Sequence, residues 1–151
     1  MYYSYLASPI GRLFIGEKSS KISYISMDYV DGYIEKETDI LKECKKQLTE
    51  YFNKKRTVFD IPIYLDGTDF QVSVWKALQT IPYGETKNYK EVAKLIGNPN
   101  ASRAVGNANN KNKILIIVPC HRVIGATGGL VGFGAGIDNK QLLLELEKDM
   151  L

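Results

Sequence analysis

The sequence predicts an α+β protein in which a small antiparallel β-sheet with one helix precedes a helical part. Residues 1–29 alternate apolar and polar side chains between short turns such as Ser8-Pro9-Ile10-Gly11, a pattern typical of an antiparallel meander. Residues 39–52 then repeat apolar side chains at helical spacing, with Asp39 as the expected N-cap. Beyond residue 66, short helical patterns broken by Pro and Gly predict a helix-turn-helix.

The length of the chain allows one domain, or two small ones that share an interface. We place a boundary at about residue 66, where the Asp66-Gly67 turn ends an extended connection. Residues 1–66 are then an amino-terminal β+α domain with its linker, and residues 67–151 are a carboxy-terminal domain. The net charge of +3 indicates a mildly basic surface, which is compatible with nucleic acid but is weak evidence by itself.

The cysteine content favours a reducing compartment. Cys44 and Cys120 are the only cysteines, and no C-x-x-C pair suggests a structural zinc site or a disulfide framework. A disulfide between the two is formally possible, but Cys44 lies on the apolar stripe of its helix and is interpreted as a core residue. The chain begins without the pattern of a secretory signal, and no apolar run is long enough to span a bilayer. We therefore expect a cytoplasmic protein with no metal site and no membrane partner.

Two short helices separated by a glycine form the predicted helix-turn-helix. Asn88 and Glu91 are a capping pair for residues 89–96, which Gly97 ends, and Asn98 is expected to cap a second helix reaching about Asn109. The second helix is rich in small residues, which favours close packing against a neighbouring helix. The alternative is that the helix lies in a DNA groove with Arg103, its one long basic side chain, reaching into the duplex.

The strongest chemical signal is Pro119-Cys120-His121-Arg122-Val123, which follows an apolar run at residues 114–118 with the length of a buried strand. A thiol reacts only as its thiolate and therefore needs a base, and His121 is the only histidine. Adjacent side chains in extended chain point to opposite faces, so a link from Cys120 to His121 needs a turn or a bridging water. The alternative is a structural cysteine at the edge of the core.

A loop with six glycines, residues 125–136, follows this motif and allows close approach of a ligand to the backbone. It lacks the strand and helix context of a dinucleotide-binding loop. An Asp138-x-x-Gln141 capping box begins the last helix, in which Glu145 and Glu147 fall off the apolar stripe. Either acid is ordinarily a solvated surface charge, but one near the core could orient His121.

Taken together, these motifs resemble the O6-alkylguanine-DNA alkyltransferase family over residues 70–147. The matching elements occur in the family's order and spacing: Ile81-Pro82-Tyr83-Gly84-Glu85-Thr86, Arg103-Ala104-Val105-Gly106, Pro119-Cys120-His121-Arg122-Val123 and the glycine loop. The resemblance implies a ribonuclease H-like first domain, in outline, and a second domain of winged helix-turn-helix type that holds the active site.

The resemblance implies DNA repair by a direct, irreversible transfer of an alkyl group from O6-alkylguanine to the protein's own cysteine. O4-alkylthymine is a second candidate substrate. Such proteins bind double-stranded DNA through the minor groove and flip the damaged nucleotide into a pocket. Each molecule would react once, as a monomer and without a cofactor, and would be found with the nucleoid, or in the nucleus of a eukaryotic source.

By position in the family's motifs, four residues would be catalytic, and a fifth, Arg103, would bind DNA. Cys120 resembles the acceptor, His121 the base that takes the thiol proton through a water, and Glu147 the acid that orients this histidine. Tyr89 resembles the tyrosine that forces the nucleotide out of the stack and donates to guanine N3. Arg103 resembles the finger that fills the vacated space.

Further residues are assigned to DNA and to the substrate pocket by the same resemblance. The DNA-binding set adds Asn98, Ala101, Ser102 and Arg122. The pocket set comprises Val123, Phe133, Gly134, Ala135 and Asn112, the last stabilising the turn before the active site. The chain departs from the family at Lys113, where proline is usual, at Phe133, where tyrosine is common, and at Ala135, where glycine is frequent.

Other functions remain as alternatives. A non-catalytic helix-turn-helix module would read one DNA sequence, but the alanine-rich second helix lacks the long polar side chains that base readout needs. A cysteine hydrolase would turn over repeatedly, but no second histidine supplies a separately placed base. A protein that recognises alkylated bases without repairing them would not need Cys120.

Overall fold

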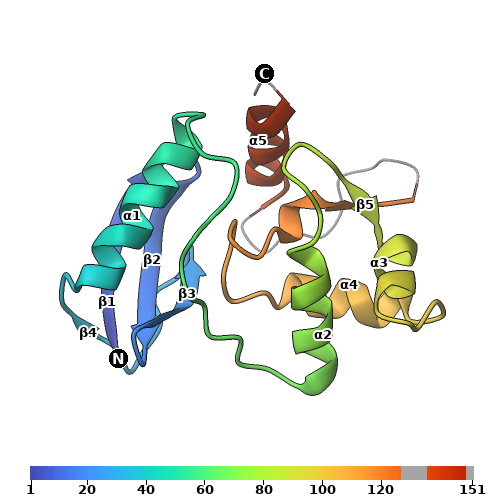
Figure 1. Cartoon of the computed structure of the whole chain (residues 1–151), viewed down its shortest axis with the longest axis horizontal. Helices are drawn as coiled ribbons and strands as arrows, with labels where there is room; N and C mark the ends of the chain where they lie inside the picture. The colour runs from blue at the N-terminus through green and yellow to red at the C-terminus, as the bar shows by residue number, and fades with distance from the viewer. Residues whose placement is uncertain (127–135, 149–151) are drawn as a thin grey trace. The chain divides into compact units, whose positions relative to one another are not determined.

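The computed structural model describes residues 1–126 and 136–148, which divide into two compact units (Figure 1). Residues 1–65 form the first unit, and the second unit begins at Asp66. Each unit contains its own buried apolar residues. No helix among the described residues is both long enough and apolar enough to span a bilayer.

The first unit is built on a four-stranded sheet of order β3-β2-β1-β4. Its strands are β1 (Tyr2–Ser8), β2 (Gly11–Lys18), β3 (Lys21–Ser26) and β4 (Ile34–Glu35). The predicted antiparallel meander is confirmed for β1, β2 and β3. The short strand β4 was not predicted, and it pairs in parallel with β1.

One helix, α1 (Asp39–Phe52), packs on this sheet through a buried apolar stripe (Figure 1). Cys44 is fully buried on that stripe, and burial raises the pKa of its thiol to about 12, as expected for a core cysteine. The expected cap at Asp39 is wrong by one residue. Thr38 is the N-cap, and its hydroxyl accepts from the backbone N–H of Leu41.

The second unit is mostly helical. Its elements are α2 (Asp69–Leu78), β5 (Lys87–Asn88), α3 (Tyr89–Leu95), α4 (Ser102–Asn110), the one-turn 3₁₀ helix η1 (Cys120–Arg122), β6 (Val123–Ile124) and α5 (Ile137–Lys148). The predicted capping pair of α3, Asn88 and Glu91, is present, and α2 begins with a capping box formed by Thr68 and Gln71. The sole tryptophan, Trp75 on α2, is buried and donates its indole N–H to the carbonyl of Ala108 on α4 at 2.9 Å.

The helix-turn-helix is formed by α3 and α4, which pack together (Figure 1). Gly97 ends α3 as predicted, because its φ of +76° allows the backbone N–H groups of Gly97 and Asn98 to bond back to Lys94 and Ala93. The expectation that Asn98 caps the second helix is wrong. Residues 98–101 instead form a turn closed by the Ala101 N–H on the Asn98 carbonyl, and α4 begins only at Ser102.

The apolar run at residues 114–118 is not a strand. Its backbone folds into successive turns, with hydrogen bonds from Ile117 N to Leu115 O and from Val118 N to Ile114 O. Ile116 adopts a left-handed φ of +71°, which a β-branched residue rarely does. The run is apolar because it is buried in the second unit, and the strand prediction is therefore wrong.

Candidate active site

Cys120 lies at the first position of η1, directly after Pro119, with its side chain buried at 2% exposure. The backbone N–H of Cys120 donates to Val118 O, and the N–H of Val123 closes the turn on the carbonyl of Cys120. Strand β6 follows this turn and pairs in parallel with β5, which leads into α3. This pairing brings the first residue of α3, Tyr89, to the Cys120 turn.

Asn112 stabilises the loop that leads to Cys120. Its amide donates to the carbonyls of Ile114, at 3.1 Å, and Val118, at 2.8 Å, and its oxygen accepts from the N–H of Ile114 at 3.0 Å. These bonds form although Lys113 replaces the usual proline. Lys113 instead forms an ion pair with Asp66 at 3.5 Å. Asn112 therefore acts on the backbone of this loop.

His121 is fully buried, and its Nε2 lies 2.5 Å from the Glu147 Oε2 atom on α5. Because an ionised carboxylate only accepts hydrogen bonds, Nε2 carries the hydrogen and Nδ1 is left as an acceptor. Among the described residues, nothing hydrogen-bonds to Nδ1. Glu147 thus orients the imidazole, and Nδ1 is the atom that can take up a proton.

Arg122 lies beside His121 but points inward. Its Nε and Nη2 atoms donate to the two carboxylate oxygens of Glu147 at 2.9 and 3.1 Å, and its Nη1 donates to the carbonyl of Ile81 at 2.7 Å. Only 8% of the side chain is exposed. The expectation that Arg122 contacts DNA is corrected by this placement, because its guanidinium is engaged by a buried carboxylate and a carbonyl.

The ionisation of Glu147 and His121 follows from these contacts. Burial opposes the charge on Glu147, but the hydrogen bonds from His121 and Arg122, the charge of Arg122, and the charge of His121 when its ring is protonated outweigh it and lower the pKa of Glu147 to about 2. Burial lowers the pKa of His121, although the Glu147 carboxylate opposes this shift. At neutral pH the imidazole is therefore neutral and can act as a base.

The Cys120 thiol is protonated at rest. Burial raises its pKa to about 11, against the opposing effects of the Asn112 hydrogen bond, the charge of Lys140 and nearby backbone N–H groups. Tyr89, at the start of α3, has its pKa raised by burial and by the negative charge of a Cys120 thiolate. A nucleophilic thiolate must therefore form together with the loss of its proton to a base.

The other residues assigned to DNA are more exposed than this buried cluster. Arg103, near the start of α4, is exposed, as is Asn98 in the preceding turn. Ala101 and Ser102 are partly exposed at the N-terminus of α4. The described residues thus place Arg103 on the surface of the helix-turn-helix, as its expected role requires.

Lys140, which the sequence analysis did not single out, belongs to the site. It is buried on α5, and its Nζ donates to the carbonyl of Val123 at 2.5 Å. Lys140, Leu143 and Glu147 follow one another at positions i, i+3 and i+7, and all three are buried. The expectation that Glu147 falls off the apolar stripe of this helix is therefore wrong, since Glu147 is buried on the same face as Leu143.

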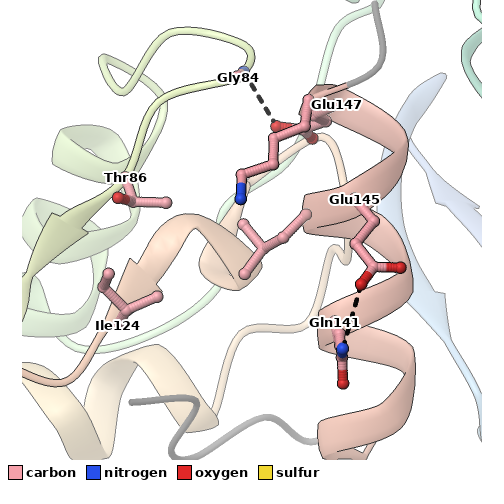
Figure 2. A pocket seen from close by; sticks show the side chains of 8 residues that line it. Gly84, Thr86, Ile124, Gln141, Glu145 and Glu147 are labelled. Carbon is pink, nitrogen blue, oxygen red and sulfur yellow. Dashed lines mark hydrogen bonds between the residues drawn. The ribbon is translucent and has the colours of Figure 1, made fainter. Parts of the chain in front are cut away.

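A pocket of about 340 Å³ borders the Glu147 end of α5, with Thr86 and Ile124 opposite the helix (Figure 2). Gly84 donates its backbone N–H to Glu147 at 3.2 Å at the pocket's rim (Figure 2). Cys120 does not line this pocket, so the pocket is not the site of the thiol. Phe133, Gly134 and Ala135, which were assigned to the substrate pocket, lie outside the described residues. Among the residues that the structure describes, no cluster of potential metal ligands occurs.

Comparison with known proteins agrees with this arrangement. Family models described as the ribonuclease-like domain and the DNA binding domain of 6-O-methylguanine DNA methyltransferase match residues 1–65 and 69–149. A methylated-DNA–protein-cysteine methyltransferase of Methanosarcina acetivorans is 47% identical over 154 residues, which cover 97% of this chain and 98% of the relative.

Solved structures extend the similarity to the fold. The crystal structure of Mycobacterium tuberculosis O6-methylguanine methyltransferase has 47% sequence identity and a TM-score of 0.92, covering 99% of this chain and 94% of the other. The structure of Mycobacterium tuberculosis OGT in complex with DNA has the same identity and coverage and a TM-score of 0.94. These matches extend over both units. The chain therefore belongs to the 6-O-methylguanine DNA methyltransferase family.

Proposed function

We propose that this protein repairs DNA by transferring the alkyl group of O6-alkylguanine to Cys120 in a single, irreversible event. The observation that carries the proposal is the buried His121, which follows Cys120 in the chain. The hydrogen bond from His121 Nε2 to Glu147 keeps His121 Nδ1 as an acceptor. Family membership supplies the substrate class, since the relatives are methylated-DNA–protein-cysteine methyltransferases. O4-alkylthymine is a second candidate substrate.

The reaction is a displacement at the alkyl carbon. Cys120 passes its proton through a water to Nδ1 of His121, the sulfur–carbon bond forms, and the carbon–O6 bond breaks with its electron pair going to guanine. Tyr89 donates a proton to guanine N3 and is reprotonated through solvent, to which His121 releases the thiol proton. One proton thus moves from thiol to guanine in total, and the balance requires no cofactor.

The thioether product explains why the protein should act once. To regenerate the thiol, a carboxylate or imidazole would have to attack the alkyl carbon and displace the Cys120 thiolate, which is a poor leaving group from an alkyl carbon. The neutral His121 and the ionised Glu147 can move protons but cannot regenerate the thiol. We therefore expect one alkyl group per molecule.

Binding to double-stranded DNA is assigned to the helix-turn-helix. Support comes from the exposed Arg103 on α4 and from the 47% identical OGT of Mycobacterium tuberculosis, which was solved with DNA. In this proposal Arg103 fills the space of the flipped nucleotide, and Tyr89, at the start of α3, forces the nucleotide out of the stack. Flipping costs a few kcal/mol of stacking, least for a badly paired base, which favours damaged sites.

We place this activity in the cytoplasm, with the DNA. The relatives are archaeal and bacterial proteins, and both cysteines are free thiols, of which Cys120 must stay reduced to react. We further propose that the protein acts as a monomer, because every group assigned to the reaction comes from one chain.

The test is the intact mass of the protein after incubation with duplex DNA containing O6-methylguanine, followed by peptide mapping. The expected result is a gain of one methyl group, confined to Cys120 and saturating at one per molecule. Cys44→Ala serves as the matched control and should gain the same mass, because Cys44 is a core residue of the other unit. No gain by a folded, reduced protein that still binds the DNA would refute transfer and leave recognition of damage without repair.

A further inference from the structure

Two buried side-chain atoms in the described part of the chain have no hydrogen-bond partner, and one of them is Oδ1 of Asn109 on α4. Asn109 is 1% exposed, and its Nδ2 atom donates to the carbonyl of Cys120 at 3.4 Å. The other atom is Nδ1 of His121, which the proposed reaction already uses as the base. An unpaired buried acceptor is costly, so Oδ1 of Asn109 is a ready partner for a donor that enters the site.

The carbonyl of Cys120 fixes the direction in which the Asn109 amide points. With Nδ2 toward the carbonyl, the amide donates a hydrogen bond, whereas the reverse orientation would set two acceptor oxygens against each other. The two residues are 11 positions apart, so this bond also links α4 to η1. Oδ1 is thereby kept as an acceptor next to the reactive residue.

The same face of α4 lies against Tyr89. Gly106 precedes Asn109 by three residues, and residues at this spacing share a helix face. A Cβ atom at Gly106 would lie 3.7 Å from Cδ1 and Cε1 of the Tyr89 ring, so the ring packs directly on this part of α4. Helices α3 and α4 pack together (Figure 1). Asn109 therefore lies one turn from the Tyr89 ring and in contact with the backbone of Cys120.

The two candidate substrates differ in the donors that they offer to such an acceptor. Alkylation at O6 leaves N1, N3 and N7 of guanine as acceptors, so the amino group at C2 carries the N–H hydrogens of the base. That group shares its carbon with N3, the atom to which Tyr89 donates in the proposed reaction. The base of O4-alkylthymine has no N–H group, because its N3 has lost its hydrogen and its N1 is bonded to the sugar.

We propose that Oδ1 of Asn109 accepts a hydrogen bond from the C2 amino group of the flipped guanine, and that Asn109 thereby determines base specificity. The inference rests on the proposed function, which supplies the flipped base. Cys120 is as buried as Asn109, so the site has to open for a base to reach the thiol, and the same opening exposes the amide that holds its carbonyl. A base without the amino group leaves Oδ1 unpaired, which makes O4-alkylthymine the poorer substrate.

The test compares two duplexes that differ only in this amino group, one with O6-methylguanine and one with O6-methylhypoxanthine. The rate constant of methyl transfer is measured for each with protein in excess, and their ratio reports how strongly the amino group is read. An unpaired buried acceptor typically costs a factor of about 5 to 100. We expect a wild-type ratio of about tenfold or more in favour of guanine. Asn109→Leu, similar in size but without an acceptor, should lower that ratio by about fivefold or more.

The two rates separate recognition of the base from support of the structure. If Asn109 only holds the backbone of Cys120, Asn109→Leu should slow transfer from both duplexes by the same factor, which would overturn the proposal. If Oδ1 binds the amino group, transfer from O6-methylguanine should slow by the larger factor, and the preference over O4-methylthymine should shrink as well. Asn109→Ala should show the same lowered ratio. Asn110→Leu, at an exposed position of the same helix, is the matched control and should keep the wild-type ratio.

The outcomes decide the two proposals separately. The same ratio in Asn109→Leu and in the wild-type chain, while the wild type transfers methyl groups, overturns the role of Asn109 and leaves the repair function standing. Absence of transfer by the wild-type chain overturns the function. In that case, or if neither Asn109 variant folds, the ¹³Cγ signal of Asn109 in Cys120→Ser decides. It should move further on addition of the O6-methylguanine duplex than of the O6-methylhypoxanthine duplex, and equal movement refutes the contact.

Discussion

Replacing Glu147 by Gln tests the arrangement on which the proposed chemistry depends. Within the described part of the chain, the carboxylate accepts hydrogen bonds from His121, from two atoms of Arg122 and from the backbone N–H of Gly84. A glutamine has one acceptor oxygen and adds an N–H₂ donor, so at least one donor of His121 or Arg122 must face another donor. The substitution also leaves the buried guanidinium without its counter-charge.

The loss of stability can be worked out in two ways that agree. Removing one partner of a buried ion pair typically costs about 3–5 kcal/mol. The pKa of Glu147, lowered from 4.5 to about 2, corresponds to about 3 kcal/mol by linkage. Because the folded-state pKa is the lower one, this contribution is complete above about pH 4.5 and is lost as the pH falls toward 2.

The effect on alkyl transfer has a separate cause. With Gln at position 147, the amide can donate to Nε2 of His121, and the imidazole hydrogen then moves to Nδ1, the atom that should act as the base. General-base catalysis is typically worth about 10²–10⁴ in rate. We expect Glu147→Gln to lower the rate of single-turnover methyl transfer by a factor in that range.

The assay for stability is urea unfolding followed by the fluorescence of Trp75, the sole tryptophan, which is buried in the same unit. At pH 7, Glu147→Gln should unfold with a free energy about 3 kcal/mol lower than the wild-type chain, and the gap should narrow toward pH 2. Glu145→Gln, an exposed neighbour on α5, should stay within about 0.5 kcal/mol. Equal stability of Glu147→Gln and wild type at pH 7, with an unchanged transfer rate, would refute the reasoning.

Two further substitutions probe the loop and the DNA-binding helix. Asn112→Ala removes three hydrogen bonds to backbone groups, so it should lower the free energy of unfolding by about 2–4 kcal/mol and raise the pH midpoint of thiolate absorbance. Arg103→Ala should leave urea unfolding within about 0.5 kcal/mol of wild type, because the side chain is exposed. Its methyl transfer from duplex DNA should fall by about tenfold or more, while transfer from the free O6-methylguanine base stays unchanged. Equal losses on both substrates would contradict a role for Arg103 in flipping.

Local sequence signals predicted the parts of the fold that local contacts determine. The capping box of α3 and the stop at Gly97 depend on residues within a few positions of one another, and both are confirmed. The prediction that Asn98 caps α4 was wrong because a polar residue followed by proline is compatible with two local structures. Pro99 fits the first turn of a helix, but it fits the second position of a β-turn equally well, and the turn formed here.

Contacts between distant residues account for what the sequence could not predict. Arg122 looks like a surface cation next to a catalytic motif, and its partner Glu147 lies 25 residues further along the chain. The run at residues 114–118 has the composition of a strand, but burial selects that composition whatever the backbone conformation. Glu147 could be matched to a role only by resemblance, and Lys140 not at all, because burial of a charged side chain is decided by tertiary packing.

The resting state of Cys120 suits a protein that can react only once. A surface thiol with a low pKa would be present as thiolate at neutral pH and open to any electrophile or oxidant. Burial keeps Cys120 protonated, with a pKa of about 11, and Glu147 keeps His121 oriented as a neutral base. The thiolate therefore forms only when its proton can leave to a base. Burial thus lowers the reactivity of the Cys120 thiol toward other electrophiles and oxidants before the protein binds its substrate.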